Sequence, residues 1–264
     1  MSTLITSLQN PLVKEVLHLK EKSRERKKSG YFIIEGQREL TLSLKGNYKI
    51  ETLLLCADLV ITNDFDSLGI KTVLVNRAVY EKIAYRESTE GVLAIAKAKD
   101  HSLKSLKLSK NPLILVAEAP EKPGNIGALL RTADAAKLDA VLIANPITDL
   151  YNPNIIRSSV GCVFTTPIGM GSTSEIITFL KKRSIHIYCA ALSASKKYIH
   201  IDYTNAAAIV VGTESKGLSK NWLENSEQNI IIPMQGEIDS LNVSVSAAIL
   251  IFEAKRQRRF NIYE

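Results

Sequence analysis

The sequence predicts an α/β protein with two domains, the second built on a mainly parallel sheet. Three observations lead to this prediction. The chain has 264 residues, 45% apolar and 23% charged, which is typical of a globular protein and enough for two ordinary cores. Short apolar runs alternate with helical stretches along the whole chain. A polar, weakly periodic stretch at 99–111 separates two such series and is the expected linker.

The first series, residues 1–98, is expected to form one domain. A helix is predicted over 11–28, because Pro11 occupies a first-turn position, apolar residues fall roughly on one side, and Gly30 ends the stretch. Shorter elements follow in alternation, with strands at 31–35, 52–56, 72–75 and 92–96 and helices at 37–44 and 77–85. This alternation favours a small α/β layer structure.

The second series, residues 112–264, begins directly at Pro112. Its strands are near-continuous apolar runs, which are typical of parallel strands covered by helices on both faces. Ligands bind beyond the carboxyl ends of such strands, so the loops after them are the candidate sites. The expected strands are 113–117, 140–144, 163–166, 186–191, 208–211 and 230–233, and the expected helices are 126–136, 153–160, 174–182, 219–224 and 241–258.

Composition excludes several classes of protein. No run approaches the roughly 18 apolar residues of a membrane span, and residues 1–6 contain no secretory signal. The three cysteines, Cys56, Cys162 and Cys189, stand far apart in apolar surroundings and in no metal spacing. We therefore expect reduced thiols, no metal and a cytoplasmic location.

Basic residues gather in one run near the N-terminus. The net charge is +7, and six of the basic residues fall within nine positions: Lys20, Lys22, Arg24, Arg26, Lys27 and Lys28. A run of this kind is either a solvated helix face or a contact for nucleic acid, and the sequence leaves both readings equally open.

The first candidate loop follows strand 113–117. Pro123 and Gly124 predict a turn, and Asn125 is expected to cap the next helix. The free N–H groups of a helix start suit a phosphate. Arg131 has apolar neighbours in sequence. It is either a surface residue whose charged end reaches solvent or a cation that the fold holds in position for its function.

The second candidate loop, 212–219, follows strand 208–211. It contains Gly212 and Glu214 but neither glycine-rich phosphate fingerprint, which argues against a conventional dinucleotide enzyme or a P-loop NTPase. Spacing alone favours Glu214 as an exposed turn acid over a ligand-facing carboxylate.

The third candidate loop precedes the last helix. Ser240 and Asn242 lie on either side of Leu241, and helix capping accounts for only one of them. Small residues at 244 and 246–248 suit close packing against another backbone, including that of a second subunit. All four histidines lie outside the three loops, so a histidine-based hydrolase is unsupported.

Taken together, the segments 123–133 (Pro-Gly-Asn-Ile-Gly-Ala-Leu-Leu-Arg-Thr-Ala), 211–218 and 232–248 resemble the three signature motifs of the SpoU (TrmH-type) RNA 2′-O-ribose methyltransferases of the SPOUT superfamily. The resemblance covers roughly residues 112–260. Residues 1–98 resemble, less sharply, the ribosomal-protein-like substrate-binding domain of several ribosomal RNA methyltransferases, whereas tRNA-specific members generally carry short helical extensions.

The resemblance implies a fold, a reaction and a set of site residues. It implies a small N-terminal α/β sandwich, a SPOUT domain with a C-terminal trefoil knot, a homodimer, and S-adenosylmethionine as the methyl donor for a ribose in RNA, rRNA rather than tRNA. The catalytic group that it implies is Asn125, Arg131, Glu214, Ser240 and Asn242, and the cofactor contacts are Leu192, Gly212, Ile232, Met234 and Leu241. The basic run at residues 20–28 is then expected to bind RNA.

Three alternatives remain. A non-catalytic RNA-binding or ribosome-assembly protein could retain the same fold without binding S-adenosylmethionine. A tRNA 2′-O-methyltransferase would share the three motifs. A nucleotide-dependent α/β enzyme would lack the usual glycine fingerprints and would be stabilised by NAD instead.

Overall fold

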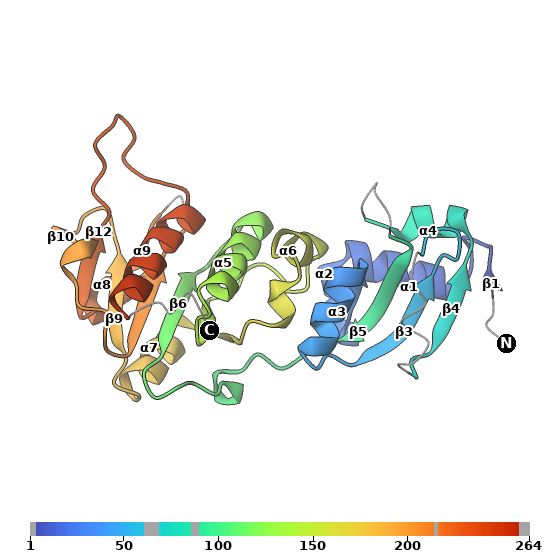
Figure 1. Cartoon of the computed structure of the whole chain (residues 1–264), viewed down its shortest axis with the longest axis horizontal. Helices are drawn as coiled ribbons and strands as arrows, with labels where there is room; N and C mark the ends of the chain where they lie inside the picture. The colour runs from blue at the N-terminus through green and yellow to red at the C-terminus, as the bar shows by residue number, and fades with distance from the viewer. Residues whose placement is uncertain (1–3, 61–68, 86–89, 214–215, 259–264) are drawn as a thin grey trace. The chain divides into compact units, whose positions relative to one another are not determined.

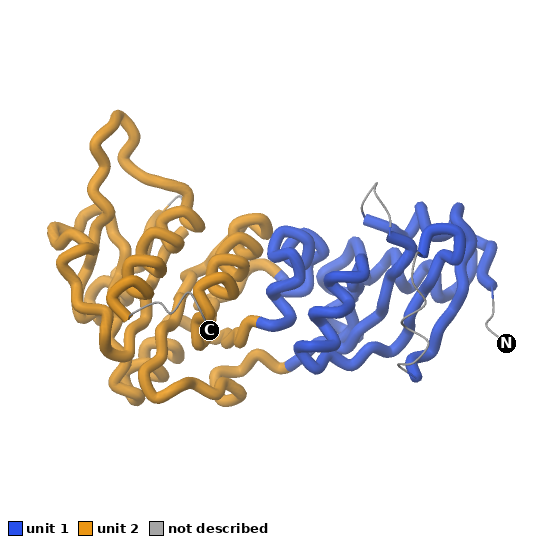
Figure 2. The backbone as a smooth tube through the Cα atoms, in the orientation of Figure 1, with its two compact units in different colours: residues 1–99, 149–165 blue, residues 100–148, 166–264 orange. Residues whose placement is uncertain are grey.

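Figure 1 shows the chain as a computed structural model, which describes residues 4–60, 69–85, 90–213 and 216–258. The chain forms two compact units (Figure 2). The N-terminal unit comprises residues 1–99 and 149–165, and the C-terminal unit comprises residues 100–148 and 166–264. Residues 149–165 fall within the second domain expected from sequence, yet they pack with the N-terminal unit.

The N-terminal unit contains a five-stranded mixed sheet in the order β1-β4-β3-β5-β2. β1, β4 and β3 run parallel, and β5 is antiparallel to both β3 and β2. Apolar side chains of α1 and α4 bury one face of the sheet. The strands are β1 (Leu4–Ile5), β2 (Tyr31–Glu35), β3 (Ile50–Leu55), β4 (Thr72–Val75) and β5 (Val92–Lys97), and the helices are α1 (Pro11–Glu21), α2 (Ser23–Ser29), α3 (Gln37–Lys45), α4 (Arg77–Ile83) and α6 (Pro153–Ser158).

The helix predicted over 11–28 is wrong in one respect, because it is interrupted. Lys22 is extended, with φ −113° and ψ 107°, and separates α1 from α2. The break brings Arg26 back towards α1, where its Nη1 donates to the carbonyls of Leu19 at 2.6 Å and Lys20 at 3.1 Å. Gly30 ends α2 in the left-handed region at φ 73°, which confirms the predicted stop.

An aromatic cluster explains why residues 149–165 belong to the N-terminal unit. The rings of Phe32 and Tyr151 stack with centroids 4.1 Å apart, and Phe164 meets the edge of Tyr48 at 5.1 Å. The strand predicted at 163–166 is therefore wrong. Residues Cys162–Phe164 form a 3-10 turn that directs Phe164 into this cluster, and the strand lies later, at β8.

The C-terminal unit contains a seven-stranded sheet in the order β10-β12-β9-β11-β6-β7-β8. Every pairing in it is parallel, which confirms the predicted parallel sheet. Its strands are β6 (Leu113–Glu118), β7 (Ala140–Ala144), β8 (Ile168–Gly171), β9 (His186–Ala190), β10 (Lys196–Lys197), β11 (Ala207–Val211) and β12 (Gln228–Ile231), and its helices are α5 (Pro123–Ala135), α7 (Thr173–Lys181), α8 (Lys220–Asn225) and α9 (Val243–Gln257).

Helices cover both faces of this parallel sheet. Buried side chains of α7 and α8, including Phe179 and Trp222, pack on one face with Val116 and Val210. α5 and α9 lie side by side, with α9 against β11 and α5 against β7 (Figure 1). Parallel strands end at one edge, so the loops after β6, β9, β11 and β12 gather there. Among the described residues, no helix combines the length and the apolar composition that crossing a membrane requires.

Candidate active site

The first and third candidate loops meet at the carboxyl edge of the parallel sheet. The side-chain nitrogen of Asn242 lies 3.3 Å from the side-chain oxygen of Asn125, although 117 residues separate them in sequence. Both side chains are thus brought to the point where α5 and α9 begin.

Asn125 does not cap its helix, so that expectation is wrong. α5 begins at Pro123, and Lys122 occupies the cap position without capping the helix through its side chain. Proline lacks an N–H and has a φ suited to a helix, so it is favoured at the first helical position. Asn125 is consequently the third residue of α5, and its side chain is directed to Asn242 instead.

Of the two polar residues astride Leu241, Asn242 is the helix cap. Its side-chain oxygen accepts from the backbone N–H of Ser244 at 2.9 Å and from the Ser244 hydroxyl at 2.6 Å. Its nitrogen remains available for Asn125. Ser240 is exposed, and its hydroxyl donates to Asp239 at 2.9 Å. Asn242 therefore starts α9 and orients Asn125 with one side chain.

The second candidate loop folds back on the end of β11. Thr213 and Gly217 form an antiparallel bridge, with N–O distances of 3.1 and 3.0 Å. A Cβ atom at Gly212 would lie 2.2 Å from the carbonyl carbon of Gly217, so only glycine permits this closure. Glu214, which the motif resemblance places in the catalytic group, lies outside the described residues.

The larger of two neighbouring cavities in this region has a volume of about 840 Å³. It is lined by the segments that follow β9, β11 and β12 and by the start of α9. All five residues expected to contact the cofactor line it, together with Ser240 and Asn242: Leu192, Gly212, Ile232, Met234 and Leu241. The Leu192 side chain is 60% exposed, which leaves an apolar surface open to a ligand at the cavity.

The smaller cavity, of about 310 Å³, is lined by the first loop, including Pro120, Lys122 and Asn125. It shares Gly212, Thr213 and Val243 with the larger cavity. Two cavities that adjoin at a turn, each lined by polar and apolar groups, are suited to holding two different ligands beside one another.

Arg131 is set apart from both cavities. It lies on the exposed side of α5 and is not among the described residues that line either cavity. The structure therefore brings together Asn125, Ser240 and Asn242 of the expected catalytic group but does not bring Arg131 to them within the unit.

Some side chains of the basic run are exposed, whereas others are already bonded to groups within the N-terminal unit. Lys22, Arg24, Lys27 and Lys28 are exposed. Arg26 is 5% exposed and forms an ion pair with Asp149, so its guanidinium is committed inside the N-terminal unit.

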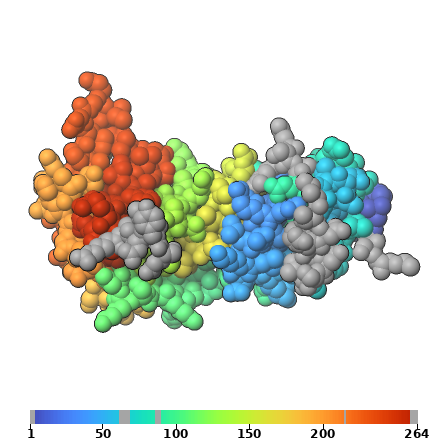
Figure 3. All heavy atoms as spheres, in the orientation of Figure 1, coloured from blue at the N-terminus to red at the C-terminus, as the bar shows by residue number. Residues whose placement is uncertain are grey.

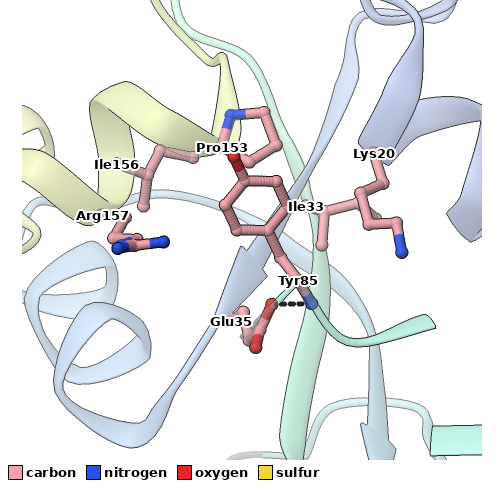
Figure 4. Close-up of a pocket in the computed structure, with 7 residues that line it drawn as sticks. All are labelled: Lys20, Ile33, Glu35, Tyr85, Pro153, Ile156 and Arg157. Carbon is pink, nitrogen blue, oxygen red and sulfur yellow. Dashed lines mark hydrogen bonds between the residues drawn. The ribbon is translucent and has the colours of Figure 1, made fainter. Parts of the chain in front are cut away.

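Lys20 is also bonded within the N-terminal unit. Its ammonium donates to the carbonyls of Lys82 at 3.2 Å and Ala84 at 3.1 Å, and burial lowers its pKa. Figure 4 shows it among the residues that line a small cavity, with Tyr85 between it and Arg157. This cavity has about 20 Å³ of free space, room for about one water molecule and too little for a nucleotide.

Sequence reasoning missed part of the site. Thr213 and Lys216 line the larger cavity, and their position just after a buried strand was the available signal. Glu118 was also missed, although an acid that ends an apolar strand is unusual, and it is 6% exposed at the same edge. Within the described ranges, no three His, Cys, Asp or Glu side chains gather to hold a metal ion.

Comparison with known proteins follows the division of the chain. Residues 112–252 match the SpoU rRNA Methylase family, and residues 10–94 match the MRM3-like substrate binding domain. The 23S rRNA (guanosine(2553)-2′-O)-methyltransferase RlmP of Bacillus subtilis is 30% identical over 251 residues, which are 95% of this chain and 98% of that protein.

Solved structures are also similar to almost the whole chain. A crystal structure of an RNA 2′-O ribose methyltransferase superposes with a TM-score of 0.84 at 38% identity, covering 97% of this chain and 99% of that one. The AdoMet-bound rRNA methyltransferase of Sinorhizobium meliloti gives a TM-score of 0.88 at 27% identity, with coverage of 97% and 98%. The similarity therefore extends over both units.

Proposed function

The chain belongs to the SpoU rRNA methylase family, and we infer that it transfers the methyl group of S-adenosylmethionine to a ribose 2′-hydroxyl of ribosomal RNA. One observation carries this inference at the level of the site. Four segments far apart in sequence form two adjoining cavities, of about 840 and 310 Å³, whose common boundary is Gly212, Thr213 and Val243.

We propose that the larger cavity holds S-adenosylmethionine. Its size falls in the usual range for a small-molecule site. Leu192, Met234 and Leu241 offer apolar surface, and Gly212 and Ile232 offer backbone groups at strand ends. When bound, S-adenosylmethionine supplies an electrophilic methyl group on a sulfonium.

The smaller cavity is proposed to receive the target ribose. Asn125 lines it, and Asn242, which holds Asn125, lines the larger cavity. The two amides can therefore orient a hydroxyl at the boundary between the cavities. Orientation of this kind lowers a bimolecular barrier by up to about 7–11 kcal/mol in favourable cases.

Arg131 is proposed to clamp the phosphate beside the target ribose. A guanidinium stays protonated in proteins and then offers no lone pair, so it suits a fixed cation better than a base. A cation at this place also stabilises negative charge that develops on the hydroxyl oxygen. Because Arg131 is exposed and apart from both cavities of its own unit, we propose that it serves the site of a second subunit.

This assignment requires a homodimer, and α9 is the proposed contact. Val245 is 46% exposed and Phe252 44% exposed on this helix, beside α5, which carries Arg131. α9 lies at the molecular surface in Figure 3. Apolar side chains exposed on one helix are suited to an isologous contact.

The family also supports a trefoil knot at the end of the chain. β12 lies near one end of the sheet order, and the chain then returns so that α9 packs against β11 and α5. We propose that this return passes through a loop of the same domain, with residues 112–264 as the catalytic domain.

The N-terminal domain, residues 1–98, is proposed to bind the RNA substrate. Its match to a substrate-binding domain supports this role, as do the exposed cations Lys22, Arg24, Lys27 and Lys28. Two of the relatives named above are rRNA methyltransferases, which favours rRNA over tRNA. An rRNA substrate and three free cysteines favour a cytoplasmic location.

The decisive experiment compares ribose methylation in RNA from cells with and without the gene for this protein. A 2′-O-methyl group lost from one rRNA nucleotide, and restored by the purified protein with S-adenosylmethionine, is the expected result. A lost tRNA methyl group would shift the substrate class. RNA binding without S-adenosylmethionine binding, measured by calorimetry, would favour the non-catalytic alternative, and stabilisation by NAD alone would favour a nucleotide enzyme.

A further inference from the structure

A buried carboxylate connects the segments beneath the two cavities. Glu118 is the last residue of β6 and is 6% exposed. Its Oε2 accepts from the backbone N–H of Ser219 at 2.8 Å. Its Oε1 accepts from the Ser219 hydroxyl at 2.8 Å and from the Thr173 hydroxyl at 2.9 Å. One side chain therefore joins β6, the end of the second loop, and the first residue of α7.

Two of these residues, Glu118 and Ser219, stand directly beside a residue that lines a cavity. Ala117, next to Glu118, lines the smaller cavity, and Gly217 and Leu218, next to Ser219, line the larger one. Gly217 is also paired with Thr213 by an antiparallel bridge. The bonds from Ser219 to Glu118 hold the chain directly after Gly217 and Leu218.

The surrounding network requires an acceptor at Glu118. The Asn145 side-chain nitrogen already donates to the Thr173 hydroxyl at 2.9 Å, so that hydroxyl directs its own proton to Glu118. The backbone N–H of Ser219 can only donate. Hydrogen bonds from donors of this kind offset the cost of burying the polar side chain of Glu118.

We propose that Glu118 is a positioning residue for methyl transfer, which fixes the second loop in the form that binds S-adenosylmethionine. This proposal rests on the function inferred above. Glu118 lines neither cavity itself among the described residues, so it acts through Ser219 and the adjoining lining residues Gly217 and Leu218.

The main test is Glu118→Gln, which keeps the size of the side chain and removes one acceptor. The amide NH2 group must face either the Ser219 N–H or the two hydroxyls, so at least one donor loses its partner. We expect the Kd for S-adenosylmethionine to rise about tenfold or more, since the loop then spends much of its time in a form that does not bind. RNA affinity is expected to stay unchanged.

Glu175→Gln is the matched control. Glu175 is also a carboxylate in the first turn of α7, where it accepts from the N–H and hydroxyl of Ser172 at 2.7 and 2.8 Å. It is bonded to neither loop among the described contacts. Its loss is expected to lower the thermal midpoint while the Kd for S-adenosylmethionine stays within about twofold of wild type.

Ser219→Ala keeps the test decisive if Glu118→Gln fails to fold. It removes one hydroxyl donor and leaves the backbone N–H in place. We expect the Kd for S-adenosylmethionine to rise less than it does in Glu118→Gln. The double variant should bind S-adenosylmethionine no more weakly than Glu118→Gln alone, because both changes act on one contact.

The outcomes separate the proposal from the function on which it rests. If the wild-type chain fails to bind S-adenosylmethionine, the inferred function is wrong. If the wild-type chain binds it and Glu118→Gln binds it equally well, the positioning role is wrong. A Glu118→Gln variant that loses RNA and S-adenosylmethionine affinity together would also overturn the proposal, because the effect would then be general.

Discussion

The Asn242 side chain donates to the Asn125 side chain at 3.3 Å while it caps α9 through Ser244 at 2.9 Å. The start of the last helix and the orientation of a catalytic candidate thus depend on a single amide. The oxygen of that amide serves the helix and the nitrogen serves Asn125, so substitutions can separate the two roles.

Asn242→Asp is expected to retain stability and lose activity. An aspartate caps a helix about as well as asparagine, but its carboxylate cannot donate to Asn125. We expect kcat to fall about tenfold or more, with an unchanged thermal midpoint. Asn242→Ala, the companion variant, should lose the same activity and about 1 kcal/mol of stability as well. Full methyl transfer by Asn242→Asp would show that the contact has no role in the reaction.

Arg131→Lys distinguishes a phosphate clamp from a general base. If Arg131 is a clamp, activity is expected to be lower than wild type at every pH from 7 to about 10, because an ammonium cannot make the same two-pronged contact. A base would behave otherwise, since the lysine amine has an ordinary pKa near about 10.4 and would act as it deprotonates. The measurement is the pH profile of kcat/KM, and recovery of activity at high pH contradicts the clamp.

Mixing two inactive variants tests whether Arg131 serves the partner's site. In a heterodimer of Arg131→Ala and Asn125→Ala, one site would combine an intact Asn125 with an intact Arg131 from the other subunit. Random pairing should then restore about a quarter of wild-type activity after joint refolding. Each variant mixed with itself is the control. Absence of recovery, with heterodimers demonstrated by mass, would place Arg131 in its own subunit's site.

The exposed cations of the N-terminal unit are expected to set the salt dependence of RNA binding. Each phosphate contact contributes about 0.7–0.9 to the slope of log K against log salt. Replacing Lys22, Arg24, Lys27 and Lys28 together by Gln should therefore flatten that slope and leave binding of S-adenosylmethionine intact. Lys71→Gln changes an exposed lysine elsewhere in the same unit and is the control. An identical slope in the quadruple variant would remove this run from the RNA contact.

Alkaline pH is expected to weaken the N-terminal unit through Tyr48. Burial, followed by the neighbouring Tyr151, raises the pKa of Tyr48 far above its usual range. Its folded pKa exceeds its unfolded value of about 10, so its contribution is fully present below pH 10 and is lost as pH rises further, by up to about 1.4 kcal/mol per unit.

Tyr48→Phe removes this ionisation and should flatten the alkaline decline. Hydrogen exchange of amides in β2 and β5 at pH 9 to 11.5 measures it, with Tyr85→Phe as the control because Tyr85 is 43% exposed. Equal declines in wild type and Tyr48→Phe would contradict the assignment.

The local pattern of apolar residues in the sequence was sufficient to predict most of the architecture. The parallel sheet followed from near-continuous apolar strands, and most helices and strands lie within a few residues of their predicted bounds. Where prediction was wrong, a tertiary contact prevailed over local pattern. Phe164 joins an aromatic cluster, so an apolar run that favours a strand forms a turn instead.

The sequence likewise identified most of the candidate site, but not all of it. Three separated motifs, marked by their residues and order, were enough to indicate the family, the cofactor and which side chains to examine. The sequence did not reveal Glu118, since the donors that justify a buried carboxylate come from Thr173 and Ser219, 55 and 101 residues away.

By itself, then, the sequence determined the fold class, the family and the motif residues, because periodicity and residue type are local properties. Only the tertiary structure decided which of those residues meet. It turned Arg26 inward to Asp149, set Arg131 apart from both cavities, and brought Asn242 to Asn125. The physical reason is that burial and hydrogen bonding depend on neighbours in space, which the packing of distant segments alone supplies.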